Sequence, residues 1–178
     1  MSVSLILTLI GEDKPGLVEL LSQTIAAHDG NWQESRMSRM AGRFAGILRA
    51  SVPTARAEEL TEALLALEPQ GLRVLIERSL SEEDEAVFRR ISLDLVGADR
   101  AGIIRDIARA LAGRRINVDE LDTECTSAPM SGETLFNAHA SLRVPIGIAI
   151  DELYEALEEI AHDLMVDITL GDVQEGEA

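Results

Sequence analysis

The chain contains one sequence motif twice, and this repeat constrains its fold more than any other feature. Residues 5–18, LILTLIGEDKPGLV, recur as residues 91–104, ISLDLVGADRAGII. The register continues beyond the motif, because Asn31 recurs as Asn117, 86 residues later. Self-similarity at a fixed spacing indicates repeated structural units. In a chain of 178 residues the repeat therefore predicts two small domains rather than one.

Each copy opens with the hydrophobic pattern of a strand followed by a helix. Ile91, Leu93 and Leu95 alternate with polar residues, which predicts a half-buried strand. The apolar residues that follow recur at helical spacing and predict one buried face. They are Ile104, Ile107, Ala108 and Leu111 in the second copy, and Leu17, Leu21 and Ile25 in the first, where Val18 and Leu20 widen the stripe.

The remaining patterns complete the same plan in both halves. Strands are predicted from Asn31 and Asn117, at residues 44–52 and 135–144, and at residues 72–79 and 165–170. Second helices carry the apolar stripes Leu60, Leu64 and Leu67, and Leu153, Leu157, Ile160 and Leu164, the latter with Asp151 as the expected N-cap. The order β-α-β-β-α-β predicts an α+β fold of two tandem ferredoxin-like domains.

We predict a first domain at residues 1–80, an acidic linker at 81–87, a second domain at 88–172 and a C-terminal tail at 173–178. Phe44 corresponds to Phe136, 92 residues later, so the second copy carries an insertion, which we place around residues 127–132. Domains of this size bury only about 60 to 65% of their unfolded surface. We therefore expect the copies to associate with each other or with a second chain.

Charge and composition exclude several classes of partner. The net charge is −16, with 32 acidic residues against 16 basic ones, which argues against direct binding of nucleic acid. No apolar run approaches the roughly 20 residues of a membrane span, and no signal peptide precedes the first strand. Cys125 is the single cysteine, so no intrachain disulfide can form, and a cytoplasmic location is expected.

The residues that commonly carry metal or nucleophilic chemistry show no productive spacing. Cys125 has no ligand spacing with His28, His139 or His162, and we expect no metal and no cofactor. Cys125 and His139 fall on neighbouring predicted strands, but the first copy has no counterpart of this pair. A lone cysteine in a strand is usually a small buried hydrophobe. We therefore expect no enzymatic activity.

The loop shared by the two copies is the candidate ligand site, with an asparagine at the start of the next strand. Its glycines allow a tight turn, and the helix N-terminus presents unpaired amides to a carboxylate. Pro15, near the first helical position, loses no needed donor. Asp13 or Asp99, with the neighbouring asparagine, would accept from an α-ammonium. The candidate residues are Gly11, Asp13, Lys14, Pro15, Gly16, Leu17, Val18 and Asn31, and Asp99, Arg100, Ala101, Gly102, Ile103, Ile104 and Asn117.

A structural reading of the loop remains open beside the ligand-binding one. Glycine and proline make a good turn by themselves, and the aspartate would then cap the helix. In that case the protein would be an interaction protein whose loops have no ligand.

At these loops the chain resembles the ACT domain family, whose ferredoxin-like modules bind amino acids and regulate metabolism. Residues 11–16, GEDKPG, and 97–102, GADRAG, resemble its D-R/K-P-G signature, and Asn31 and Asn117 stand in the G/I-N pair that opens its second strand. The sequence departs from the signature at Ala101, where proline is usual, which leaves the second loop less preorganised.

The tandem pair without a catalytic domain, and the segment 128–136, are similar to the glycine cleavage system transcriptional repressor family. The resemblance implies a regulator that contacts a DNA-binding transcription activator rather than DNA. It also implies that a small amino acid such as glycine or serine modulates this contact. Modules of this family associate side by side through helices and edge strands, which implies that the two copies pair within the chain and that the protein is a homodimer. A detached regulatory subunit of an amino-acid enzyme is the other alternative.

Overall fold

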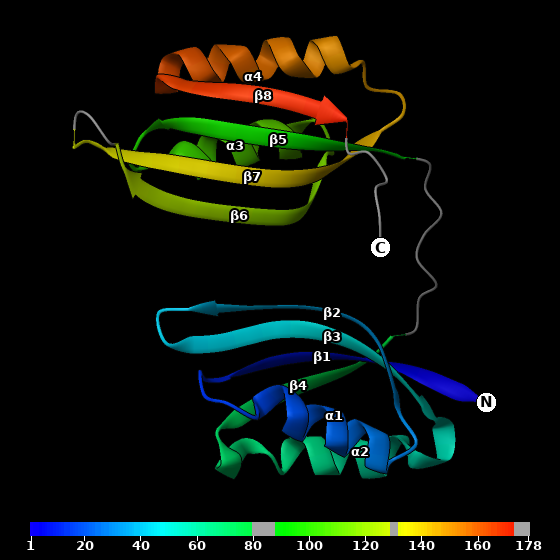
Figure 1. Ribbon diagram of the computed structural model, residues 1–178. Helices are drawn as coiled ribbons and strands as arrows, with labels where there is room; N and C mark the ends of the chain where they lie inside the picture. The colour runs from blue at the N-terminus through cyan, green and yellow to red at the C-terminus, as the bar shows by residue number, and fades with distance from the viewer. Residues whose placement is uncertain (80–87, 129–131, 173–178) are drawn as a thin grey trace. The chain divides into compact units, whose positions relative to one another are not determined.

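The computed structural model describes residues 1–79, 88–128 and 132–172. The chain divides into two compact units, Met1–Asp84 and Glu85–Ala178, and each has the element order β-α-β-β-α-β (Figure 1). The predicted α+β fold of two tandem ferredoxin-like domains is confirmed. The predicted linker at 81–87, the tail at 173–178 and residues 129–131 of the predicted insertion lie outside the described residues.

The first unit is a four-stranded antiparallel sheet in the order β2-β3-β1-β4, with two helices. Its elements are β1 (Ser2–Glu12), α1 (Leu17–Ala27), β2 (Asn31–Met40), β3 (Arg43–Pro53), the 3-10 helix η1 (Thr54–Arg56), α2 (Ala57–Leu65), the 3-10 helix η2 (Glu68–Gln70) and β4 (Leu72–Ser79). The last strand has the bounds that the sequence predicts.

The second unit repeats this topology, with its antiparallel strands in the order β6-β7-β5-β8. Its elements are β5 (Phe88–Ala98), α3 (Ile103–Gly113), β6 (Asn117–Ser127), β7 (Thr134–Pro145), α4 (Ile150–Leu164) and β8 (Val166–Asp172). The last strand starts one residue later than predicted, because Met165 is left-handed, with φ 53°, where α4 ends. The predicted cap at Asp151 is also wrong: Ala149 is the N-cap, and Asp151 lies in the first turn.

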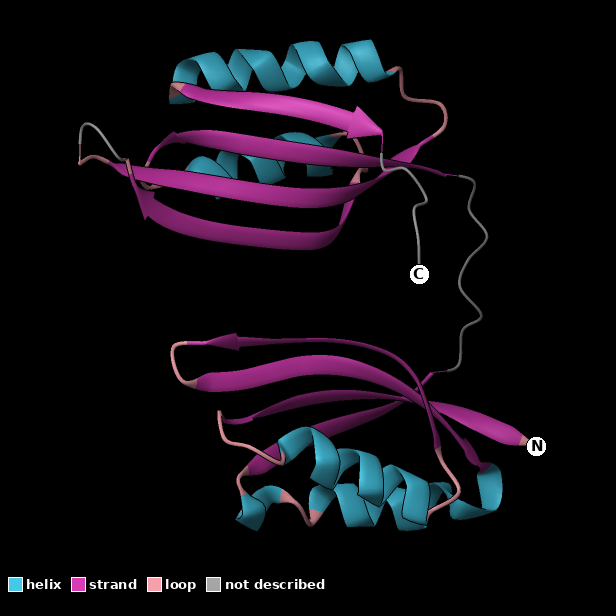
Figure 2. Cartoon of the chain, in the orientation of Figure 1, coloured by secondary structure: helices cyan, strands magenta, loops and turns pink. Residues whose placement is uncertain are grey.

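Each unit has its own hydrophobic core between the sheet and its two helices, which cover the same face (Figure 2). Strand alternation places Leu5, Leu7 and Leu9 of β1 on this face, and all three are buried. The stripe Leu17, Leu21 and Ile25 of α1 packs in the same core. Within the described residues, no helix combines the length and apolar composition that a membrane span needs.

The buried face of α3 differs from the predicted one by a small rotation. Ile103, Ile107 and Leu111 are buried, whereas Ala108 is exposed and Ile104 is half-buried. Both sets satisfy the helical period, and the choice depends on where the helix begins. Because α3 starts at Ile103 directly after the loop, that residue is the first of the stripe. In α1, Val18 is likewise 48% exposed and does not extend the stripe.

Among the described residues, no helix of the same unit covers the opposite face of its sheet, and we call this face the open face. In the first unit, Ile47 of β3 lies in register with Arg36 of β2 and Thr8 of β1. The equivalent row of the second unit is Asp122, His139 and Asp94. The repeat therefore preserves the fold but not the chemistry of the open faces, which is acidic in the second unit.

Candidate functional site

Two equivalent loops join the first strand of each unit to its first helix, and a glycine sets the geometry of both. Gly16 and Gly102 are the helix N-caps, with φ 91° and 101°, a left-handed conformation that favours glycine. The first helical residue is therefore Leu17, and Pro15 lies two residues before it, outside the helix. Neither N-cap has a side-chain hydrogen bond, so the alternative that Asp13 caps the helix is wrong.

The first glycine of each motif is required for packing against the last strand of its own sheet. A Cβ atom on Gly11 would lie 2.5 Å from the carbonyl oxygen of Gly71. A Cβ atom on Gly97 would lie 2.5 Å from Cγ1 and 2.9 Å from Cα of Val166. Both approaches are too close for any side chain. These two glycines therefore have a structural role that needs no ligand.

The basic residue of each loop forms a hydrogen bond with a backbone carbonyl near the end of the second helix of its unit. Lys14 Nζ donates to the carbonyl oxygen of Gln70 at 2.6 Å, and Arg100 Nη2 donates to that of Asp163 at 2.9 Å. Asp163 lies in the last turn of α4, where carbonyls have no partner within the helix. A cation there also interacts favourably with the helix dipole. Two matching contacts in two copies indicate that this residue stabilises the loop.

We expect Arg100→Met to lower the free energy of unfolding by up to about 1 kcal/mol, because an exposed hydrogen bond to a helix-end carbonyl is lost. Arg109→Met is the matched control. Arg109 is exposed on α3 and has no hydrogen bond or ion pair among the described residues. Urea unfolding followed by circular dichroism measures the free energy of unfolding of both variants. Equal effects of the two substitutions would show that the contact to Asp163 contributes nothing.

The aspartates of the two loops have different environments. Asp13 forms an ion pair with Arg39 of β2. Cys125 takes the place of Arg39 in the second unit, because Arg39 lies opposite Phe44 and Cys125 opposite the equivalent Phe136. Within residues 1–79, 88–128 and 132–172, the Asp99 side chain has no ion pair or hydrogen bond. The first aspartate is thus neutralised by its own domain, whereas the second is available to a cation.

Both loops are also fixed through their backbone. The amide of Asp13 donates to the carbonyl oxygen of Gly42 at 3.0 Å, and that of Asp99 to Thr134 at 2.9 Å. The second loop carries a further charge pair in the first turn of α3. There Arg105 donates to both carboxylate oxygens of Asp106, and this hydrogen bonding holds the pKa of Asp106 below its usual range.

The amides of the first helical turn are the part of the predicted site that could receive an anion. The first intrahelical bond of α1 is donated by the amide of Leu20 to Gly16, at 2.9 Å, and that of α3 by Asp106 to Gly102, at 3.0 Å. The amides of residues 17–19 and 103–105 precede these bonds and have no acceptor in the helix. The side chains of Leu17 and Ile103 are buried in the cores, so these residues would contribute backbone groups only.

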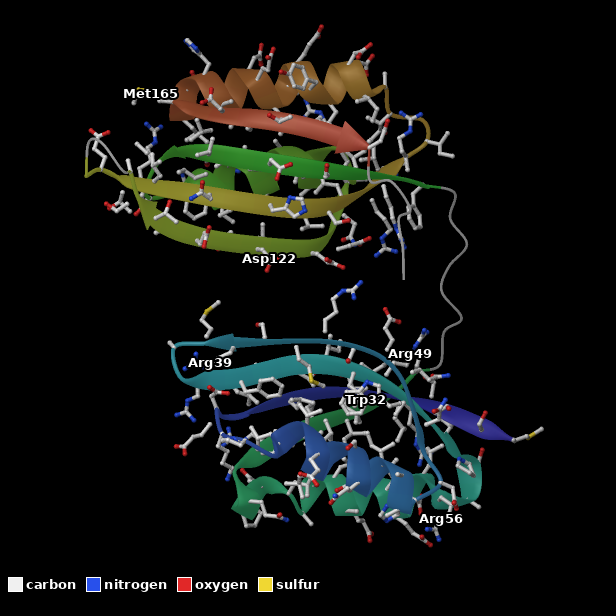
Figure 3. All side chains as sticks on the ribbon, in the orientation of Figure 1. Trp32, Arg39, Arg49, Arg56, Asp122 and Met165 are labelled. Carbon is white, nitrogen blue, oxygen red and sulfur yellow. The ribbon has the colours of Figure 1, made fainter. Side chains whose placement is uncertain are left out.

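The structure does not bring Asp13 and Asn31 together within one domain, contrary to the prediction. Asn31 begins β2 and Met40 ends it, and both Met40 and Glu12 lie opposite Arg43 of β3. The loop after Glu12 is therefore at the far end of the sheet from Asn31, roughly 30 Å away at about 3.3 Å per residue. Figure 3 labels Arg39, the ion-pair partner of the loop, near this far end.

Asn117 occupies the same place in the second unit as Asn31 in the first. Its amide nitrogen donates to Asp119 Oδ1 at 3.0 Å, and the same oxygen accepts from Arg143 Nε at 2.7 Å. Asn117 is thus engaged in a polar cluster at its own end of the sheet, away from Asp99.

Cys125 and His139 do not form a pair, as the absence of a counterpart in the first copy suggested. His139 lies opposite Asp122, and Cys125 is three residues further along β6, so the two side chains are on opposite faces. His139 Nδ1 instead lies 2.6 Å from Asp94 Oδ1. The expectation of a buried cysteine is wrong, since Cys125 is exposed. Among the described residues, no three potential metal ligands gather.

The family model of the ACT domain matches residues 4–77. This range runs from β1 to β4 and includes the first loop. The first unit is an ACT domain. The second unit has the element order and the strand order of this ACT domain, together with equivalent glycine, aspartate and basic positions in its loop.

Two solved structures resemble nearly the whole chain. An unknown protein from Galdieria sulphuraria is 28% identical, with a TM-score of 0.87 over 98% of this chain and 100% of that one. A candidate glycine cleavage system transcriptional repressor is 19% identical, with a TM-score of 0.72 over 98% of this chain and 99% of that one. The second likeness shows a shared tandem fold. No curated protein matches the chain.

Proposed function

We propose that the protein is a non-catalytic, amino-acid-binding regulator. The observation that carries this proposal is the ACT domain match over residues 4–77, which includes a loop that ends at unpaired helix amides. ACT domains are regulatory modules. A small amino acid such as glycine or serine fits a site made mainly of backbone groups.

The geometry suggests how each loop would hold such a ligand. The carboxylate would accept from the first-turn amides, where the helix dipole adds a partial positive charge. Asp99 is free to accept from the ammonium, whereas Asp13 would first have to share its pairing with Arg39. Since each asparagine lies at the far end of its own sheet, an asparagine near a loop would have to come from outside that domain. We propose a homodimer in which the ligand is held between the two chains.

The regulatory output that we propose is contact with another protein. A net charge of −16 opposes direct contact with DNA, and the tandem fold is shared with a candidate glycine cleavage system transcriptional repressor. We therefore propose a cytoplasmic regulator that binds a DNA-binding transcription activator. A detached regulatory subunit of an amino-acid enzyme is the alternative, and co-purification distinguishes the two by the partner that is recovered.

The test is a thermal-shift screen against the twenty amino acids, with isothermal titration of any that stabilise. A ligand at about 100 times its dissociation constant adds roughly 2.7 kcal/mol to the free energy of unfolding. We expect glycine or serine to do so, and Asp99→Ala and Asp13→Ala to reduce the effect, Asp99→Ala more strongly. Asp151→Ala, an exposed aspartate in the first turn of α4, is the control.

A stabilisation that survives both loop substitutions would place the ligand elsewhere. No stabilisation by any amino acid would favour an interaction protein whose loops are structural.

A further inference from the structure

The open face of the ACT domain carries a hollow that is separate from the loops. It has a volume of about 280 Å³, and its lining includes Ile6 of β1, Glu34 and Arg36 of β2, and Ile47 and Arg49 of β3. Ile6 lies opposite Arg49 in the sheet, seven residues before Asp13. Figure 3 labels Arg49 towards the end of the sheet away from Arg39, which pairs with the loop. A molecule in this hollow would therefore not touch the loop.

Arg49 has one satisfied and one unsatisfied side of its guanidinium. Its Nη2 donates to Glu34 Oε2 at 3.0 Å. Its Nε is inaccessible to solvent and has no hydrogen-bond acceptor in the described structure. The side chain as a whole is 41% exposed, and the hollow carries two arginines, Arg36 and Arg49, against the single carboxylate of Glu34. A ligand in the hollow would reach the exposed edge of this guanidinium, and a carboxylate has the planar, two-oxygen geometry that a guanidinium prefers.

The apolar residues of the lining indicate which kind of group would accompany the carboxylate of the ligand. Ile6 and Ile47 give the hollow an apolar wall, against which an alkyl group would lose exposure to water. The hollow, with a volume of about 280 Å³, is near the lower limit of ligand pockets. It therefore fits a compact ligand with a short branched chain.

The second unit provides an internal comparison, because the repeat replaces the key residues. The positions of Arg49, Ile47 and Ile6 are occupied there by Ser141, His139 and Ser92, as the strand registers show. Neither the guanidinium nor the apolar wall is present. The chemistry of the hollow is thus a property of the first domain and not a consequence of the shared fold.

We propose that this hollow binds a small branched aliphatic carboxylate. The carboxylate accepts from the exposed edge of the Arg49 guanidinium, and the alkyl group packs on Ile6 and Ile47. This site is distinct from the loops and does not depend on the amino-acid binding proposed above.

The test is a titration of the ¹⁵N-labelled full chain, followed by two-dimensional NMR, with isovalerate as the probe. We expect saturable shifts at the amides of Ile6, Ser35 and Ile47. Isobutylamine has the same branched body with the opposite charge, and acetate has the carboxylate without that body. Both should cause much smaller shifts at equal concentration.

Arg49→Gln should weaken isovalerate binding at least tenfold. Arg73→Gln is the matched control: Arg73 lies on β4, outside the lining, and pairs with the exposed Glu68. The affinity of the Arg73→Gln variant for isovalerate should stay within twofold of that of the unsubstituted protein. The dispersion of the same spectra shows whether each variant is folded.

Equal shifts with isobutylamine or acetate, undiminished binding in Arg49→Gln, or no saturable shift with isovalerate would each overturn the proposal. The loop site is tested separately, because Asp13→Ala and Asp99→Ala should leave isovalerate binding unchanged. Glycine, which has no alkyl group, should not shift the amides around the hollow.

Discussion

Leu7→Ala is expected to lower the free energy of unfolding of the first domain by about 2 to 5 kcal/mol. Leu7 is 0% exposed and lies at the centre of β1, opposite Leu48 on one side and Ile76 on the other. Its truncation removes buried apolar contacts and leaves a cavity that the neighbouring strands cannot close. The measurement is urea unfolding followed by tryptophan fluorescence. Trp32 is the single tryptophan of the chain and packs against this core, so the signal reports on the first domain.

Leu75→Ala is the matched control on the neighbouring strand. Leu75 is 62% exposed on the open face, and its truncation should change the free energy of unfolding by less than about 0.5 kcal/mol. If the two substitutions were equally costly, the assignment of the two faces of this sheet would be wrong.

Gly97→Ala is expected to destabilise the second domain by about 1 to 3 kcal/mol, because β8 must move to admit one methyl group. The clash is with the backbone and Cβ of Val166, at 2.9 Å, as well as with Cγ1, so a side-chain rotation cannot relieve it. Val166 is itself buried, which limits how far the strand can shift. Urea unfolding followed by circular dichroism at 222 nm measures the loss.

Gly113→Ala uses the same substitution at a site with room for it. Gly113 is the last residue of α3, and a Cβ atom there would meet nothing within 4 Å. Alanine should leave stability unchanged or raise it by up to about 1 kcal/mol, since it restricts the unfolded chain and favours the helix. A loss at Gly113 as large as at Gly97 would contradict the steric explanation.

The fold could be predicted because the repeat supplied two independent readings of each element. A strand assigned from Leu5, Leu7 and Leu9 is supported by Ile91, Leu93 and Leu95, and the structure buries all six side chains. Element ends were less accurate where they depend on one backbone angle. The left-handed residues Gly16 and Met165 decide where a helix begins and where another ends, and hydrophobic periodicity does not report such angles.

The candidate site was predicted less well, for a topological reason. The sequence places Asp13 and Asn31 on either side of one helix, which suggests that they are neighbours. Strand β1 is antiparallel to β3, and β3 to β2, so β1 and β2 run in the same direction. A helix that connects such strands returns the chain to the starting edge of the sheet. Asn31 therefore lies level with Ser4, at the beginning of β1 and on the other side of β3, while Asp13 follows the end of β1.

Contacts between distant side chains were beyond the sequence. The bond from Lys14 to the carbonyl of Gln70 spans 56 residues, and the sealed Nε of Arg49 depends on how three strands pack around it. Neither leaves a local pattern. Only the comparison of the two copies shows that a basic residue recurs at this loop position, as Lys14 in the first copy and Arg100 in the second.

The replacement of Arg39 by Cys125 makes the chain convenient for spectroscopy. One thiol in the whole sequence, exposed on an edge strand, allows a fluorophore or spin label to be attached at a single place without mutagenesis. The label would stand beside the second loop, where the first domain has its ion pair. Cys125→Ser combined with Arg39→Cys would move the label to the corresponding place in the first domain. The two copies could then be observed one at a time in the intact protein.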